Sequence, residues 1–517
     1  MPAARPGAEP TAAPGSGAPA APHAGEPVAH RAAAPGGDPV AHRAAADAAP
    51  AAAAGAPAAH PAAHPAAHQA AAHRAAAHRD RAATGAAPPA GDPVALLLAG
   101  AYRDPDTGAA LRAETRALAI EDDLDGAEVE LVRGLELGPR VAVLSDRDTH
   151  AALGARVERA LGSRLAVQSI VLPRAPRADA DTVTRLLAVT RPDLDAVVAV
   201  GAGTVNDLAK LVAHRRGVPQ VVFATAPSMN GFTSVSASIL DGGVKRSIRT
   251  ATPRGVFFDL RVLAAAPAPL VRAGLGDSLC RATAQTDWLL AHLLLDRPYR
   301  QAPFALLAAD EAALRAEPDA LLAGDLGAMR HLVRTLVLSG FGMTICGGSF
   351  PASQGEHLLA HYVGMKRPPG VPEALHGAEI GVCTLLMARL QRRVLERDRP
   401  PRLLPSAVSA DDVRRRFGPV AGEACWREVA PKLLDAARAD ALDARLAAAW
   451  DALRARLLAV SLDAAHLQRV LAAAGAPTAP AALGWPPALV AEAMRHAREI
   501  RDRYTFLDLA ADARLAP

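Results

Sequence analysis

The sequence predicts an N-terminal α/β domain with a parallel sheet, followed by an all-α C-terminal domain, and two patterns indicate this fold class. Between residues 140 and 224, short runs of β-branched and small apolar residues alternate with segments of helical spacing. Strands that alternate with helices favour right-handed crossovers and a parallel sheet. From about Val262 the spacing is helical almost throughout, with long Ala-, Leu- and Arg-rich stretches such as 432–462. We therefore expect an α/β domain at 93–260 and a helical domain at 261–517.

Residues 1–92 have a different composition from the rest of the chain. They consist mainly of Ala, Pro, Gly, His and Arg, with approximate repeats at 26–31 and 38–43. Because large apolar side chains are almost absent, burial cannot offset the entropy of ordering this segment. We expect a disordered N-terminal tail, with ordered structure beginning near Val94 or Leu118.

The elements of the α/β domain follow from local pattern. Strands are expected where apolar, mostly β-branched residues follow one another, and helices where apolar residues recur at helical spacing. Gly162 and Gly217 supply helix stops. In chain order the expected elements are a strand at 140–146, a helix at 149–161, a strand at 165–172, a helix at 181–190, a strand at 197–200, a helix ending at 216 and a strand at 220–224.

A glycine turn joins the strand at 197–200 to the helix after it. Gly201 and Gly203 allow the backbone to approach a ligand, and the N–H groups and dipole of the helix start favour a phosphate there. Asn206 stands where the usual dinucleotide fingerprint has a third glycine. The alternative interpretation is that Thr204 and Asp207 form only a capping box and Gly201 only turns the chain.

Two other segments are expected at the same edge of the sheet, since parallel strands bind ligands at their carboxyl ends. Asp146 ends a strand and could accept hydrogen bonds from a ribose hydroxyl, or be only a turn residue. The loop 225–234 is rich in small hydroxyl and amide groups. We expect this loop to contact a ligand rather than to be only a solvated connection.

Composition limits the compartment and the partners. The 57 Lys and Arg against 53 Asp and Glu leave a net charge of +4, and only 3% of residues are aromatic, so base stacking on a nucleic acid is not expected. No apolar run approaches the length of a membrane span, and the N-terminus lacks the layout of a secretion signal. The four cysteines form no C-x-x-C pair, which suits a reducing compartment. We expect a cytoplasmic protein with no membrane span.

Three short stretches interrupt the Ala/Leu background of the helical domain, at 274–277, 355–361 and 375–377. His357 and His361 are four residues apart and so lie on one helix face. A carboxylate and a further imidazole from the other stretches would complete a mixed N/O site for a divalent ion. The alternative is that the histidine pair is a surface or packing feature.

The sequence resembles the sn-glycerol-1-phosphate dehydrogenase family in several segments. They are the three stretches just described, the glycine turn, the loop 225–234, and residues 351–362, 375–382 and 499–509. That family belongs to the wider group of iron-dependent alcohol dehydrogenases, glycerol dehydrogenase and 3-dehydroquinate synthase. The resemblance covers nearly everything after about Leu118. It implies a nucleotide-binding α/β domain, a helical domain that binds metal and carries catalysis, and a site in the cleft between them.

The resemblance implies roles for particular residues in this cleft. Asp277, His357 and His376 would bind the metal, which would be zinc, nickel or iron, and His361 would face the substrate and relay a proton. With Asp277 and His361, Asn230 would complete the catalytic residues. The family interconverts sn-glycerol 1-phosphate and dihydroxyacetone phosphate, a phosphorylated polyol and ketone, with NAD or NADP. The resemblance also suggests a homo-oligomer.

The resemblance also implies which residues contact the nicotinamide cofactor. They come from the end of the strand at 140–146, the glycine turn and the loop after the strand at 220–224. The expected contacts are Asp146, Gly203, Thr204, Val205, Asn206, Asp207, Thr225, Ala226, Pro227, Ser228 and Ser234.

Two positions depart from the family pattern. Asn230 stands where the family usually has an aspartate that binds a substrate hydroxyl, and Phe350 stands where it commonly has an arginine. The first change keeps a hydrogen-bond acceptor and loses a charge, whereas the second removes a guanidinium near the cleft. The pairs 245–246 and 366–367 are alternative phosphate-binding groups, or solvated turns.

Two other functions stay open at this point. A cyclising lyase like 3-dehydroquinate synthase would use NAD only transiently, but the loop after Thr225 lacks the glycine-lysine run of that enzyme. A nucleotide-binding protein with decayed catalysis would account for Asn230 and Phe350, although the complete set of metal ligands would then be coincidental.

Overall fold

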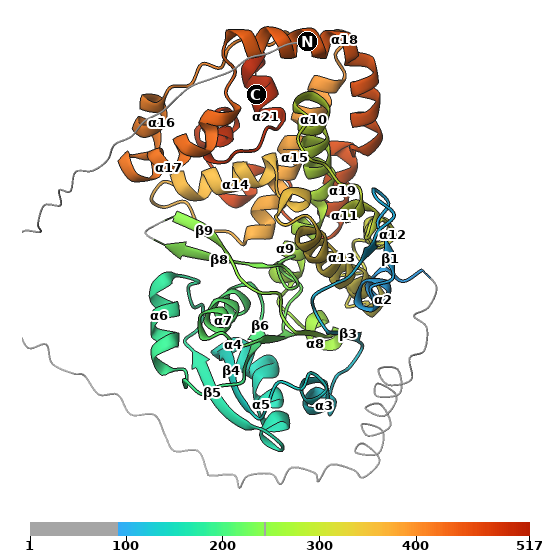
Figure 1. The fold of residues 1–517 in the computed structure, drawn as a ribbon, viewed down its shortest axis with the longest axis vertical. Coiled ribbons are helices and arrows are strands. Elements are labelled where there is room, and N and C mark those ends of the chain that lie inside the picture. Colours follow the sequence, from blue (N-terminus) through green and yellow to red (C-terminus); the bar gives the residue numbers. More distant parts are fainter. Residues whose placement is uncertain (1–90, 242–243, 517) are drawn as a thin grey trace, which may run out of the picture. The chain divides into compact units, whose positions relative to one another are not determined.

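The computed structural model describes residues 91–241 and 244–516, so nearly all of the predicted tail lies outside the described residues. A six-stranded sheet has the order β3-β10-β7-β6-β4-β5, and all its neighbouring strands are parallel (Figure 1). Its strands are β3 Ala117–Glu121, β4 Arg140–Asp146, β5 Ala166–Leu172, β6 Ala196–Gly201, β7 Gln220–Ala224 and β10 Gly255–Asp259. The expected parallel α/β sheet is confirmed.

Four of these strands were expected from the sequence, two of them (β4 and β7) at the same bounds. Strands β3 and β10 were not predicted. The residues of β3, Ala-Leu-Ala-Ile-Glu, favour a helix when taken alone, and they form a strand through pairing with β10. The apolar run of β10 is too short for periodicity to separate a strand from a helix.

Two antiparallel pairs lie outside the parallel sheet. Strands β1 Tyr102–Arg103 and β2 Ala110–Leu111 form the first pair. Strands β8 Ser236–Asp241 and β9 Val244–Arg249 form a hairpin directly after the loop 225–234. This hairpin was not expected from the sequence.

The helix expected at 149–161 begins two residues earlier than predicted. The Asp146 side chain accepts hydrogen bonds from the N–H groups of Asp148 and Thr149, and so caps a helix that begins at Arg147. In the α/β region the helical elements are α2 Pro93–Ala99, α3 Glu128–Arg133, α4 Arg147–Thr149, the π-helical η1 His150–Gly154, α5 Ala155–Gly162, α6 Ala180–Val189 and α7 Gly203–Arg216.

The capping box that was the alternative interpretation of the start of α7 is not formed. The N-cap residue is Ala202, and no side chain caps the first turn. Asp207 instead accepts a hydrogen bond from the backbone N–H of Ser238 on β8. The expected stop at Gly217 is confirmed, with this residue in the left-handed conformation at φ 69°.

After Asp259 the regular elements of the described residues are all helical, as expected. The long helix expected at 432–462 is shorter, because the Asp435 side chain caps its start. The elements are α8 Leu260–Ala264, α9 Ala268–Leu279, α10 Arg281–Leu295, α11 Ala302–Ala305, α12 Ala308–Ala316, α13 Leu326–Ile345, η2 Phe350–Ala352, α14 Gly355–Lys366, α15 His376–Leu395, α16 Ala410–Phe417, α17 Pro419–Val429, η3 Ala430–Lys432, α18 Ala436–Val460, α19 Ala464–Ala473, η4 Pro480–Leu483, α20 Pro487–His496, η5 Ala497–Ile500 and α21 Phe506–Asp512. Across the described part of the chain, none of the helices combines the length and apolar character that a bilayer span needs.

Both faces of the sheet are buried. On β6, Val197 and Ala199 pack in one apolar cluster with Leu208 of α7, whereas Val198 and Val200 pack in another cluster with residues of α5. Helices on both faces account for the continuous apolar strands. The first cluster also includes residues of α9 and α13, so the sheet and these helices share a core. The division into domains between 260 and 261 stays a prediction.

Candidate active site

A cavity of about 1110 Å³ lies at the carboxyl ends of the parallel strands. Residues at or after the ends of β4, β6, β7 and β10 contribute to its wall. Seven of the predicted cofactor contacts line it, namely Asp146, Gly203, Thr204, Val205, Thr225, Ala226 and Ser228. This is the position at which a doubly wound sheet binds a nucleotide.

The start of α7 is shaped for an anion in this cavity. A Cβ on Gly201 would lie 2.5 Å from the Cβ of Val205, so only glycine allows the helix to begin this close to the strand. Since no side chain caps the first turn, its N–H groups and the positive end of the helix dipole are directed at the cavity wall formed by Gly203 and Thr204. The arrangement suits the diphosphate of a dinucleotide.

Four predicted cofactor contacts do not line the cavity: Asn206, Asp207, Pro227 and Ser234. Asn206 and Ser234 are buried, and Asn206 contacts Gln220 through its side chain and backbone carbonyl oxygens. The Ser234 hydroxyl donates to the carbonyl oxygen of Gly231 at 3.0 Å. The role of these four residues in cofactor binding stays a prediction.

Lys210 holds the loop 225–234 and the hairpin against α7. Its buried Nζ donates hydrogen bonds to the carbonyl oxygens of Gly231 at 2.8 Å, Ser234 at 3.1 Å and Ser236 at 3.2 Å. Burial lowers the pKa of this amine to about 8, with the nearby charge of Asp207 opposing the shift. One lysine thus connects the helix at the nucleotide cavity to the segment that enters β8.

The same loop is in tight contact with α9. A Cβ on Gly274 would lie 1.7 Å from the carbonyl oxygen of Pro227, and the backbone N–H of Asn230 donates to Asp277 Oδ2 at 2.9 Å. Helix α9 also meets α15 closely, because a Cβ on Gly276 would lie 2.1 Å from the carbonyl oxygen of Gly377. Small residues therefore fix where Asp277 lies.

The three predicted metal ligands come together from three helices. Asp277 lies on α9, His357 on α14 and His376 at the start of α15, and each offers a ligand atom within 4.8 Å of the others. The His357 Nε2 atom is 3.9 Å from Asp277 Oδ1, and the rings of His357 and His376 have centroids 5.2 Å apart. One carboxylate and two imidazoles form a donor set that fits a borderline divalent cation such as zinc.

Glu356 orients the His357 ring, and this residue was not expected in the site from the sequence. Its Oε1 atom lies 2.9 Å from His357 Nδ1, which leaves Nε2 on the side of Asp277. Burial raises the pKa of the Glu356 carboxyl, but the hydrogen bond and charge of His357 outweigh burial and leave that pKa below its usual value. A carboxylate on the second ring nitrogen fixes the tautomer and strengthens a histidine ligand.

Replacing Glu356 with glutamine is expected to weaken zinc binding about 10- to 100-fold, because the amide is a weaker, uncharged acceptor for His357 Nδ1. The measurement is a zinc titration in competition with a chromophoric chelator. Glu396→Gln is the control, since Glu396 pairs with Arg392 on the exposed side of α15. Zinc affinity equal to that of the wild type in Glu356→Gln would show that His357 needs no such support.

A second group of possible ligands shares His357 and consists of Cys280, Glu356 and His357. Burial raises the pKa of the Cys280 thiol well above its usual value, whereas a metal needs the thiolate. The thiol also donates to the carbonyl oxygen of Asp277 at 3.0 Å. The set with Asp277 and His376 therefore fits a cation better.

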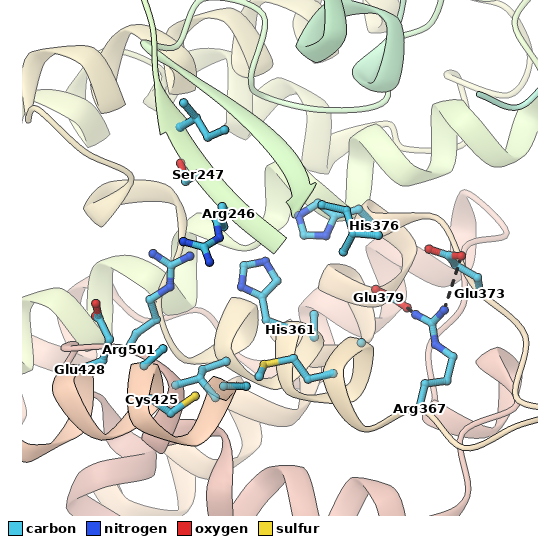
Figure 2. Close-up of a pocket in the computed structure, with 18 of the residues that line it drawn as sticks. Arg246, Ser247, His361, Arg367, Glu373, His376, Glu379, Cys425, Glu428 and Arg501 are labelled. Atoms are coloured by element: carbon cyan, nitrogen blue, oxygen red, sulfur yellow. Dashed lines mark hydrogen bonds and ion pairs between the residues drawn. The ribbon is translucent and has the colours of Figure 1, made fainter. Parts of the chain in front are cut away.

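A second cavity of about 920 Å³ lies on the other side of the histidines. His361 and His376 line it together with Arg246, Arg367 and Arg501, and Figure 2 shows these side chains around the cavity. His376 lines the nucleotide cavity as well. Of the three predicted metal ligands, His376 therefore connects the two cavities, and Asp277 and His357 lie close to it.

The two positions that depart from the family pattern have different surroundings. Asn230 lines neither cavity through its side chain, and its backbone N–H binds Asp277. Phe350 stacks on Trp288 with centroids 5.9 Å apart, and the Arg503 guanidinium lies 5.2 Å from its centroid. Phe350 thus belongs to an aromatic cluster, and the catalytic role of Asn230 stays a prediction.

The chain is similar to known proteins in sequence and in fold. A sequence model of the family described as "Iron-containing alcohol dehydrogenase" matches residues 119–267. The glycerol-1-phosphate dehydrogenase (NAD(P)+) of Geobacillus stearothermophilus is 32% identical over 382 residues, which cover 71% of this chain and 85% of that protein. The enzyme of the same name from Halalkalibacterium halodurans is 34% identical over 258 residues, 49% of this chain and 65% of that protein. The latter alignment covers slightly less than two thirds of the relative's length.

A solved structure shares the fold. Glycerol dehydrogenase from Schizosaccharomyces pombe aligns with a TM-score of 0.51 at 16% sequence identity. The alignment covers 75% of this chain and 85% of that one.

Proposed function

The chain belongs to the glycerol-1-phosphate dehydrogenase family, a family of metal-dependent oxidoreductases that use NAD(P), and we propose that it interconverts sn-glycerol 1-phosphate and dihydroxyacetone phosphate. The observation that carries this proposal is that Asp277, His357 and His376 come together and that His376 lines both cavities. One cavity has the position of a nucleotide site, and the other would take the phosphorylated ketone or polyol.

Asp277, His357 and His376 would hold one divalent ion, which we propose to be zinc, nickel or iron. When bound, such an ion acts as a Lewis acid on substrate oxygens and favours loss of the alcohol proton. Glu356 would keep His357 in the ligating orientation through its contact with Nδ1. The N–H of Asn230 would hold Asp277 Oδ2, so that the carboxylate keeps its place beside the loop.

His361 would hold the proton that is exchanged with the substrate. It lies one turn after His357 on α14, with ring centroids 5.9 Å from those of His357 and of His376, and it lines the second cavity. Imidazole suits this role, because its ordinary pKa lies near neutrality. The nicotinamide, from NAD or NADP, would approach from the side of Thr204 and Ser228, which line only the first cavity.

The test is to incubate the purified full chain with dihydroxyacetone phosphate, NADH or NADPH, and added Zn²⁺ or Ni²⁺, and to follow the absorbance of the reduced cofactor. We expect oxidation that a chelator abolishes and that added metal restores. The product should be sn-glycerol 1-phosphate, which an enzyme specific for the 3-phosphate will not oxidise. A lack of metal-dependent oxidation, or a 3-phosphate product, would contradict the proposal.

Two broader expectations accompany this function. Assembly into a homo-oligomer and a cytoplasmic location stay predictions.

Dehydrogenases among the relatives favour this function over the cyclising lyase. Phosphate release without net cofactor turnover would favour the lyase instead.

A further inference from the structure

We propose that Arg246 and Arg501 form the subsite that binds the phosphate group of the substrate. This inference rests on the proposed function, because it assigns the side chains that recognise the substrate's anionic end. The two residues come from distant segments of the sequence: Arg246 lies on β9, and Arg501 directly follows η5. Both line the cavity that contains His361 and His376.

Figure 2 shows the Arg246 and Arg501 side chains directed toward one another beside His361. Two guanidinium groups repel each other, and an anion between them would remove the repulsion. Guanidinium groups bind phosphate oxygens in a bidentate manner, and a phosphate monoester carries close to two negative charges at neutral pH. The pair therefore has the charge and geometry to hold such a group.

Neither arginine is tightly neutralised by the protein. Arg246 Nε is 3.2 Å from Asp241 Oδ2, in an ion pair whose side chains are 60% and 51% exposed, so water screens it. Among the described residues Arg501 forms no ion pair, although Glu428 lines the same cavity. Both charges therefore remain available to a ligand.

The pair at 366–367 is engaged by other protein groups. Arg367 lines the same cavity, but its guanidinium pairs with Glu379 at 3.0 Å and with Glu373 at 3.8 Å. Lys366 donates to the carbonyl oxygen of Arg416 at 2.8 Å. The pair at 366–367, one of the two alternatives from the sequence, is therefore a poor phosphate site.

The hairpin that carries Arg246 is fixed to the nucleotide-binding region. Asp207 of α7 accepts from the N–H of Ser238 at 3.1 Å, and the N–H of Leu240 donates to the carbonyl oxygen of Ala178 at 2.8 Å. At position 350, where the family commonly has an arginine, this chain has a phenylalanine, and its ring stacks on Trp288. Arg246 and Arg501 would supply the positive charge in its place.

The experiment compares two ketones that differ only in the phosphate, dihydroxyacetone phosphate and dihydroxyacetone, with Arg246→Gln, Arg501→Gln and the double variant. Each single change should lower kcat/KM for the phosphorylated ketone about 10- to 100-fold, which is the usual effect of a lost charged hydrogen bond. The value for dihydroxyacetone should be unchanged. Arg249→Gln is the matched control, since it removes a charge from the same strand at a position on the opposite face.

Equal losses with both ketones would indicate a structural role and overturn the proposal, as would no loss with dihydroxyacetone phosphate. If the wild type reduces neither ketone, the dehydrogenase function fails, and calorimetric titration of inorganic phosphate into the full chain without added metal decides on the subsite. Binding by the wild type and by Arg249→Gln, but not by the double variant, supports it. Absent binding by the wild type, or equal binding by the double variant, overturns it.

Discussion

Replacing His357 with alanine will remove the bound metal and lower the rate of ketone reduction by about 10³-fold or more, since a metal Lewis acid contributes several kcal/mol to the transition state. His357 is 6% exposed and supplies one of two imidazoles to the donor set. Its removal also takes away one partner of the buried Glu356, which keeps hydrogen bonds from the Gln354 N–H and the Thr283 hydroxyl. The measurements are the metal content after dialysis and the rate with dihydroxyacetone phosphate.

The control for this change is His214→Ala, at an exposed position in the last turn of α7. It should keep both metal and activity. Circular dichroism of both variants shows whether the fold is retained. A folded His357→Ala protein that keeps its metal and its rate would remove this histidine from the mechanism and would place catalysis elsewhere.

Replacing Gly274 with alanine will destabilise the protein by about 3 kcal/mol, because an added methyl group in a packed contact forces the backbone apart. The Cβ would lie 1.7 Å from the carbonyl oxygen of Pro227 and 2.9 Å from its carbonyl carbon, both of which are backbone atoms. The loop and α9 would separate, and the hydrogen bond from Asn230 to Asp277 would be lost. We therefore expect a lower Tm together with weaker metal binding.

Gly364→Ala is the matched control, because it makes the same change in α14 where an added Cβ has no neighbour within 4 Å. That change should leave the Tm unchanged or raise it slightly, since alanine favours the helix by about 0.5–1 kcal/mol over glycine. Equal Tm values for the two variants would mean that α9 and the loop are not packed as closely as described.

Local pattern predicted much of the α/β region. Strands such as β4 and β7 are continuous apolar runs because helices cover both faces of the sheet. Strand β3 could not be predicted, because its alanines and leucine have no local preference for a strand. It forms through pairing with β10. The β8–β9 hairpin could not be predicted from local pattern, because the residues that hydrogen-bond to β8, Lys210 and Asp207, lie on the earlier helix α7.

The candidate site was predictable to a smaller extent. The metal ligands could be named because the resemblance supplied their order, and their proximity depends on close packing at Gly274 and Gly276 that no local pattern reveals. Glu356 carries a weak signal, a carboxylate beside a histidine in an apolar helix. Arg501 lies in the stretch 499–509 that resembles the family, but its relation to the cavity arises only when distant segments meet. The capping box at the start of α7 is not formed, and the Asp207 side chain instead accepts a hydrogen bond from the backbone N–H of Ser238 on β8.

The most direct test of the metal site is the X-ray absorption spectrum of the zinc-loaded protein. A site formed by Asp277, His357 and His376 predicts only nitrogen and oxygen neighbours at about 2.0–2.2 Å, with the outer-shell scattering of imidazole rings. A zinc–sulfur distance of about 2.3 Å would contradict it, because it would place the ion among Cys280, Glu356 and His357.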